Sequence, residues 1–97
     1  MIKTIVDRFN ENLDLFKSFE HIFIFGSILK ENSNPNDIDV LLVYSEYSNK
    51  LLTEFKIIKK EFNYFQEKPF KFTALSIKEE AETAFLKKLN SNPLRIK

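Results

Sequence analysis

The first apolar pattern along the chain is helical. Over residues 1–19 the apolar positions fall three or four residues apart, which places them on one stripe of a helix: Ile2, Ile5, Val6, Phe9, Leu13 and Phe16. The charged and amide side chains between them would face solvent. The pattern therefore predicts a helix over residues 1–19.

Helical spacing returns twice later in the chain. The apolar positions over residues 51–65 predict a long helix, which Pro69 ends. A last helix follows the capping box of Ser76 and Glu79. Its predicted inward positions are Ile77, Ala81, Ala84, Phe85 and Leu89. Residues 90–97 are a predicted tail.

Three stretches have the composition of strands. Residues 22–25 are apolar at every position, so this strand is expected to be covered on both faces. Residues 37–44 begin with two aspartates and continue as an apolar run, and residues 70–75 alternate in polarity. The predicted order is helix, strand, short helical turn, strand, helix, strand and helix.

The only glycine and a pair of aspartates lie at the junction of the first two predicted strands. Gly26 and Ser27 directly follow the first strand, and Asp37 and Asp39 open the second. Residues two apart on a strand face the same side, about 6 to 7 Å from each other. Two carboxylates held that close repel each other unless a cation lies between them. A divalent metal ion with oxygen ligands is the usual solution.

The corner at Gly26 and Ser27 has two interpretations. A helical turn over residues 28–30 would direct its first N–H groups toward the corner, where they and the Ser27 hydroxyl would bind phosphate. The alternative is an ordinary strand-to-helix turn with a serine cap. The two aspartates favour the first interpretation.

The stretch from Ile22 to Tyr44 resembles the signature of the polymerase-β-like nucleotidyltransferases. That signature is a hydrophobic strand, Gly-Ser, about ten residues, and Asp-x-Asp opening a second hydrophobic strand; here nine residues separate Ser27 from Asp37. The short chain is most similar to the minimal, antitoxin-type nucleotidyltransferases, which are often encoded beside a small helical partner protein. The resemblance implies one α/β (α+β) domain over residues 1–97, with a small mixed sheet of about three strands packed by about four helices.

The resemblance also implies a chemistry. Asp37 and Asp39 would be the catalytic residues and would hold Mg²⁺, while Gly26 and Ser27 would bind the phosphates of a nucleoside triphosphate, expected to be ATP. Lys30 lies where related proteins often carry a basic residue that approaches these phosphates; otherwise it is a solvated lysine. AMP would pass to a hydroxyl of a partner protein.

One part of the family's pattern is missing. Relatives that catalyse transfer normally carry a third carboxylate on the strand after the long helix. The predicted strand over residues 70–75 contains no acidic residue, and the matching position is Lys71 or Thr73. Lys71 would neutralise Asp37 and Asp39 in place of a metal. Two functions therefore stay open: a Mg²⁺-dependent nucleotidyltransferase, and a catalytically inactive binding module or antitoxin-like partner.

The composition limits the kinds of partner and compartment that are expected for this protein. The formal net charge of +1 argues against a nucleic-acid partner, and the absence of cysteine excludes disulfides and thiolate metal sites. No apolar run approaches the length that spans a membrane. We expect a cytoplasmic protein without a membrane partner, whose oligomeric state stays open. His21, the only histidine, is expected to be a solvated turn residue.

Overall fold

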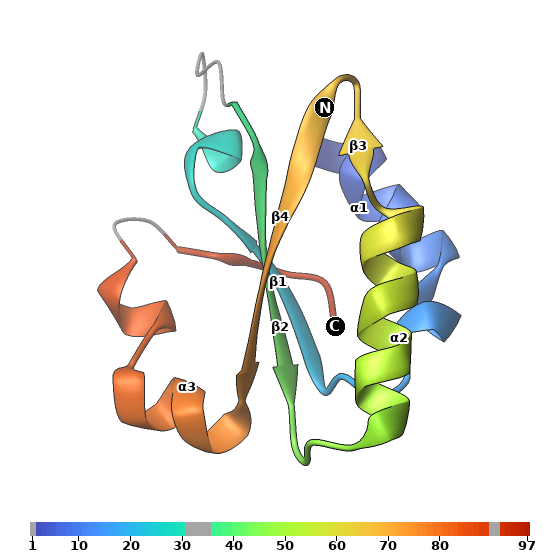
Figure 1. The fold of residues 1–97 in the computed structure, drawn as a ribbon. Coiled ribbons are helices and arrows are strands. Elements are labelled where there is room, and N and C mark those ends of the chain that lie inside the picture. Colours follow the sequence, from blue (N-terminus) through green and yellow to red (C-terminus); the bar gives the residue numbers. More distant parts are fainter. Residues whose placement is uncertain (1, 31–35, 90–91) are drawn as a thin grey trace.

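The computed structural model of the chain describes residues 2–30, 36–89 and 92–97. Within these residues five strands form one sheet in the order β3-β4-β2-β1-β5 (Figure 1). The strands are β1 (His21–Phe25), β2 (Ile38–Tyr44), β3 (Tyr64–Phe65), β4 (Lys68–Ser76) and β5 (Leu94–Arg95). β2 and β4 are parallel, and the other neighbours are antiparallel. This mixed sheet confirms the predicted α/β fold class, although it has two short strands more than expected.

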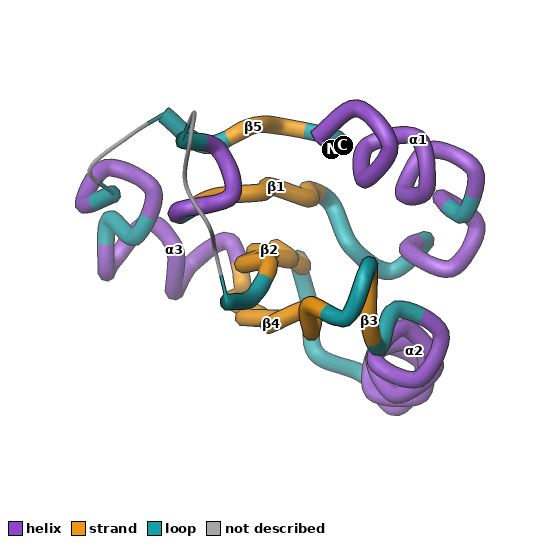
Figure 2. Tube along the Cα trace, turned by 90° about the horizontal axis from the view of Figure 1, so that it is seen from above, coloured by secondary structure: helices purple, strands orange, loops and turns teal. Residues whose placement is uncertain are grey.

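The α-helices are α1 (Ile2–Glu11), α2 (Asn49–Glu61) and α3 (Ile77–Thr83). α1 and α2 lie on one side of the sheet, and α3 lies on the other (Figures 1 and 2). Three single-turn 3-10 helices complete the described part: η1 (Leu13–Phe16), η2 (Ser27–Leu29) and η3 (Leu86–Lys88). None of the described helices is long and apolar enough to cross a membrane.

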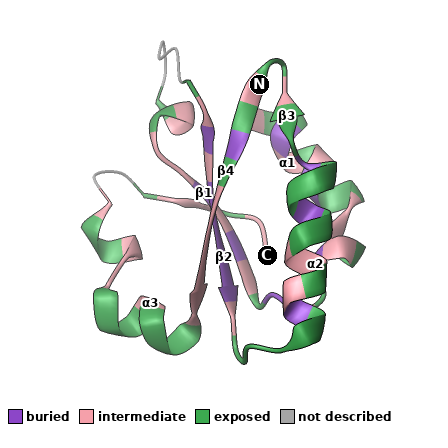
Figure 3. Cartoon of the chain, in the orientation of Figure 1, coloured by how far each residue is buried: buried purple, intermediate pink, exposed green. Residues whose placement is uncertain are grey.

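The hydrophobic core fills the space between the sheet and helices α1 and α2 (Figure 3). The aromatic rings pack closely there, with the centres of Phe9 and Phe62 4.8 Å apart. Burying a large apolar side chain contributes roughly 1.5 to 3 kcal/mol. The largest fully buried side chains are Phe9, Phe16, Phe19, Phe62, Ile5, Ile22, Ile24, Ile38, Leu41, Leu42, Ile58 and Val40.

The first helix is shorter than its apolar stripe predicts. α1 ends at Glu11, and the chain restarts as η1. Asn12 interrupts it, because its side-chain amide donates a hydrogen bond to the Arg8 carbonyl at 2.7 Å. Short polar side chains compete in this way with the helical backbone. The stripe nevertheless faces the core, since Ile5 and Phe9 are fully buried.

The prediction that the second helix extends to residue 65 is wrong. α2 ends at Glu61, and Tyr64 and Phe65 form β3, which pairs with the start of β4. The turn between these strands has Gln66 and Glu67 at positive φ angles of 50° and 68°. Two consecutive residues of this kind form the tight hairpin turns that normally carry Asn and Gly. Gln and Glu give no such signal in the sequence.

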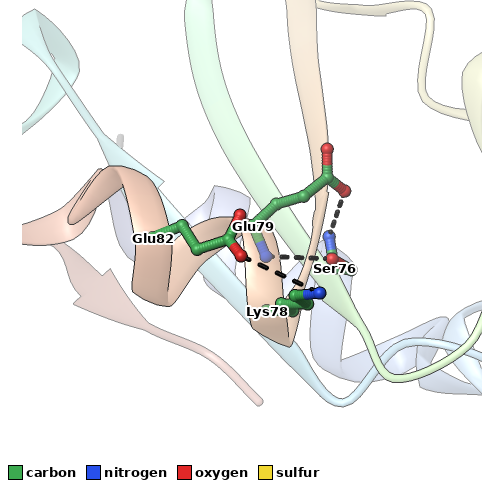
Figure 4. Close-up of polar contacts among 4 residues, drawn as sticks. All are labelled: Ser76, Lys78, Glu79 and Glu82. Carbon is green, nitrogen blue, oxygen red and sulfur yellow. Dashed lines mark hydrogen bonds and ion pairs between the residues drawn. The ribbon is translucent and has the colours of Figure 1, made fainter.

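The last predicted helix is also shorter. α3 ends at Thr83, because Ala84 adopts a left-handed conformation with φ 51°. Its capping box is present as predicted, with Ser76 and Glu79 bonded reciprocally at 3.0 Å (Figure 4). The predicted burial is wrong for Ile77, which is 48% exposed, and for Ala81, which is also exposed. The predicted tail contains β5, and the predicted loop over residues 31–36 lies mostly outside the described residues.

Candidate functional site

Gly26 connects β1 to η2 in a conformation that other residues rarely adopt. Its φ is 85° and its ψ is −159°, a region essentially restricted to glycine. A Cβ placed on Gly26 would lie 2.5 Å from Oδ2 of Asp39. The backbone angles therefore require glycine at this corner, and a Cβ there would have to displace the Asp39 carboxylate.

Asp39 lies on the central strand β2, between β1 and β4. It is directly opposite Phe25 on one side and Lys71 on the other. Residues that pair across neighbouring strands point to the same face of a sheet. Asp39 and Lys71 therefore share the face opposite the hydrophobic core.

The pKa of Asp39 is raised above its ordinary value. Partial burial is the largest cause, and the nearby charge of Asp37 is the second; the positive charge of Lys71 acts in the opposite direction. A carboxylate with these neighbours is destabilised by the other carboxylate and partly relieved by the ammonium group. Asp37, Asp39 and Lys71 thus form one electrostatically coupled group.

The other predicted site residues lie around this group. Asp37 immediately precedes β2, and Ser27 begins η2 with an exposed side chain. η2 is a single turn in which the Leu29 N–H donates to Gly26 O at 3.2 Å and the Lys30 N–H donates to Ser27 O at 3.1 Å. The predicted helical turn is therefore one residue earlier than expected, and the Lys30 side chain is exposed.

Thr73 lies farther from the aspartates than Lys71 does. It pairs with Leu41, two residues along β2 from Asp39. Strand geometry separates positions two apart by about 6.6 Å. Lys71, which is opposite Asp39 itself, is therefore closer to the aspartates than Thr73 is.

The carboxylates of Asp37 and Asp39 supply only some of the oxygen ligands that a divalent cation needs. Asp37 and Asp39 supply two carboxylates whose mutual repulsion a cation would relieve. Within residues 2–30, 36–89 and 92–97, no group of three or more His, Cys, Asp or Glu side chains is arranged to hold a metal ion. Any cation there would need further oxygen ligands from a nucleotide or water.

A second feature of the same face was not predicted from the sequence. A cavity of about 270 Å³ lies between the sheet and α3, lined by His21, Phe23, Val43, Ile77, Glu80, Leu86 and Arg95. His21 is the first residue of β1, not a turn residue, and its Nδ1 lies 3.3 Å from the Lys97 carbonyl. The sequence lacked a signal for this cavity because it depends on β5, a two-residue strand.

Comparison with known proteins adds one structural match. A crystal structure described as that of a "putative nucleotidyltransferase" is similar with a TM-score of 0.53 and 26% sequence identity, covering 97% of this chain and 91% of that chain. No protein-family model and no curated protein sequence matches the chain. The chain thus has a nucleotidyltransferase-like fold, and this likeness supports a general nucleotidyltransferase-like function.

Proposed function

We propose that this chain binds a magnesium-bound nucleoside triphosphate, ATP in the first instance, and transfers its nucleoside monophosphate to a hydroxyl of a partner protein. The observation that carries the proposal is the close approach of Gly26 to Asp39. It joins a Gly-Ser corner and an Asp-x-Asp strand on the same side of the sheet. The similar solved structure supports the reaction class but not the substrate.

Each motif has a role in this proposal. Asp37 and Asp39 would hold Mg²⁺, which when bound neutralises charge on the triphosphate. Gly26 lets the Asp39 carboxylate approach the backbone at the corner, since a Cβ there would collide with Asp39 Oδ2. The exposed Ser27 hydroxyl and Lys30 ammonium group would contact the phosphate oxygens.

The transfer step makes one bond and breaks one. The acceptor hydroxyl oxygen forms a bond to the α-phosphorus, and the bond between that phosphorus and the bridging oxygen of the β-phosphate breaks. Pyrophosphate leaves, and the proton of the acceptor hydroxyl passes to solvent water. Donors fixed at the Gly26–Ser27 corner would stabilise the charge that develops on the α-phosphate oxygens.

Labelled ATP tests this function. The chain is incubated with Mg²⁺, a cell extract and ATP labelled on either the α- or the γ-phosphate. We expect a protein band labelled from the α-position only, because the β- and γ-phosphates leave as pyrophosphate. The band should be absent with Asp39→Asn. Equal labelling by wild type and Asp39→Asn, or no labelling by either, would count against the transferase.

A second function is favoured by one specific observation. Lys71 is in register with Asp39, where a catalytic relative would carry a carboxylate. In this alternative the chain is a catalytically inactive, antitoxin-like partner of a helical protein, and Lys71 replaces the metal. Lys71→Asp would then raise Mg²⁺ affinity in isothermal titration from an undetectable level. A wild type that already binds Mg²⁺ with nucleotide, and labels an acceptor, would exclude the inactive alternative.

A further inference from the structure

The edge strand β4 has a short stretch without a partner on its outer side. The Phe70 N–H donates outward to Asn63 O at 3.2 Å, and the Ser76 N–H donates to Glu79 Oε1 at 3.0 Å. Backbone groups of successive strand residues alternate between the two edges of the strand. Phe72 and Ala74 must therefore also direct their N–H and C=O groups outward, away from β2.

Nothing in the described part of the chain pairs with these groups. β3 reaches only Lys68 and Pro69, and the capping box occupies Ser76. Figure 1 looks onto this edge, with β4 in front of the other long strands. An edge of this kind is a template for pairing with another extended chain.

An apolar pocket lies directly beside the open edge. Its volume is about 230 Å³, and it is lined by Phe19, Tyr44, Tyr47, Leu51, Leu52, Phe55 and Ala74. Ala74 belongs to both the pocket and the open edge, so a strand added to β4 would pass over the pocket mouth. Tyr47 is 65% exposed there.

A positive charge next to the pocket adds a second requirement for a segment that binds there. The Lys59 ammonium group lies 5.0 Å from the centre of the Phe55 ring, at the side of α2 that borders the pocket. Lys59 is one helical turn beyond Phe55, a rise of about 6 Å. Two residues of an extended strand span about 6.6 Å. A strand with an apolar side chain in the pocket would therefore place its side chain two residues away beside Lys59.

We propose that the β4 edge at Phe72 and Ala74, together with this pocket, binds an extended segment of a partner protein. The segment pairs with β4 through backbone hydrogen bonds, fills the pocket with one apolar side chain, and carries an acidic residue two positions from it to pair with Lys59. Backbone pairing provides affinity, and the two side chains provide selectivity. Figure 2 shows α2 beyond β4 at this edge, where it would cover one face of the added strand.

Selection of displayed peptides tests this surface without nucleotide. A library of random octapeptides is selected against the wild type and, in parallel, against Ala74→Pro. Proline at an outward-facing edge position removes only the outward N–H, so the fold should persist; circular dichroism checks it. We expect wild type alone to enrich peptides with an apolar and an acidic residue two positions apart. Equal enrichment by both baits, or none by either, would overturn the proposal.

The enriched peptide is then mapped on the ¹⁵N-labelled protein. We expect amide shifts at Phe72 and Ala74, and binding about tenfold weaker to Ala74→Pro, the effect of one lost hydrogen bond. Lys59→Gln should weaken binding about two- to fivefold, whereas the matched variant Lys60→Gln should not change it.

A peptide that is N-methylated at its pairing positions keeps its side chains but cannot donate backbone hydrogen bonds to the β4 edge. It should lose binding to the wild type, and undiminished binding would overturn the proposal even if Ala74→Pro failed to fold. A second copy of the chain is the competing occupant. Light scattering that shows a wild-type dimer and an Ala74→Pro monomer would assign the edge to self-association instead.

Discussion

Gly26 and Asp39 are packed so closely that any side chain larger than hydrogen at residue 26 would collide with the Asp39 carboxylate. The Cβ of an alanine there would lie 2.5 Å from Oδ2. Gly26 directly follows β1, whose last residue Phe25 is opposite Asp39 on β2. Gly26 therefore permits the turn and also leaves free the space that the Asp39 carboxylate occupies.

Replacing Gly26 by alanine should destabilise the fold and move Asp39. The positive φ alone costs a non-glycine residue about 1 to 3 kcal/mol. We expect the free energy of unfolding, measured in urea, to fall by at least this amount, and nucleotide binding to be lost. A Gly26→Ala protein as stable as the wild type would contradict the close contact.

The coupling among Asp37, Asp39 and Lys71 predicts two opposite pKa changes. Asp37→Asn removes a repelling charge, so the pKa of Asp39 should fall toward its ordinary value. Lys71→Gln removes the attracting charge, so the pKa of Asp39 should rise further. Carbon-detected NMR titration of the Asp39 carboxyl measures both. If neither substitution changed the titration, the three groups would not share a site.

The sequence predicted those parts of the fold whose patterns are long. The three strands β1, β2 and β4 and the capping box at Ser76 follow from apolar runs and local hydrogen-bonding residues. The two-residue strands β3 and β5 lack such a pattern, because they exist only through pairing with distant strands. The end of α2 likewise depends on Arg8, more than fifty residues away in the chain.

The candidate site was predictable to the extent that its residues are close in sequence. Gly26 follows β1 and Asp39 lies near the start of the neighbouring strand β2, so their spacing in the chain indicated their proximity. The position of Lys71 required the register of β4 against β2, which the sequence left open between Lys71 and Thr73. That register decides which side chain faces the aspartates.

Arg8 should be a major stabilising residue outside the site. Its guanidinium group donates to Glu61 O at 2.6 Å and to Tyr64 O at 2.9 Å, and it lies 4.6 Å from the centre of the Phe62 ring. We expect Arg8→Ala to lower the free energy of unfolding by about 2 to 3 kcal/mol. Amide hydrogen exchange should speed up at Tyr64 first. The exposed Lys3→Ala on the same helix is the control, and an equal effect there would refute the assignment.

The capping box at Glu79 predicts a pH dependence of stability. Hydrogen bonds from Ser76, followed by that from Tyr44, lower the pKa of Glu79 below its ordinary value of 4.5. This contribution is present above pH 4.5 and is lost as the pH falls through the lowered pKa of the folded state. Glu79→Gln should therefore be less stable than wild type at neutral pH, with the difference shrinking in acid. The control Glu82→Gln, which breaks an exposed pair with Lys78, should change little.

The most direct test of the nucleotide site is a thermal unfolding titration with ATP and Mg²⁺. At a ligand concentration ten times Kd, binding to the folded state adds about 1.4 kcal/mol, which for a domain of this size raises Tm by about 5 °C or more. We predict this rise for the wild type with ATP and Mg²⁺ together, a much smaller rise with ATP alone, and none for Asp39→Asn. An unchanged wild-type Tm at millimolar ATP and Mg²⁺, or an equal rise for Asp39→Asn, would contradict a nucleotide site at Gly26 and Asp39.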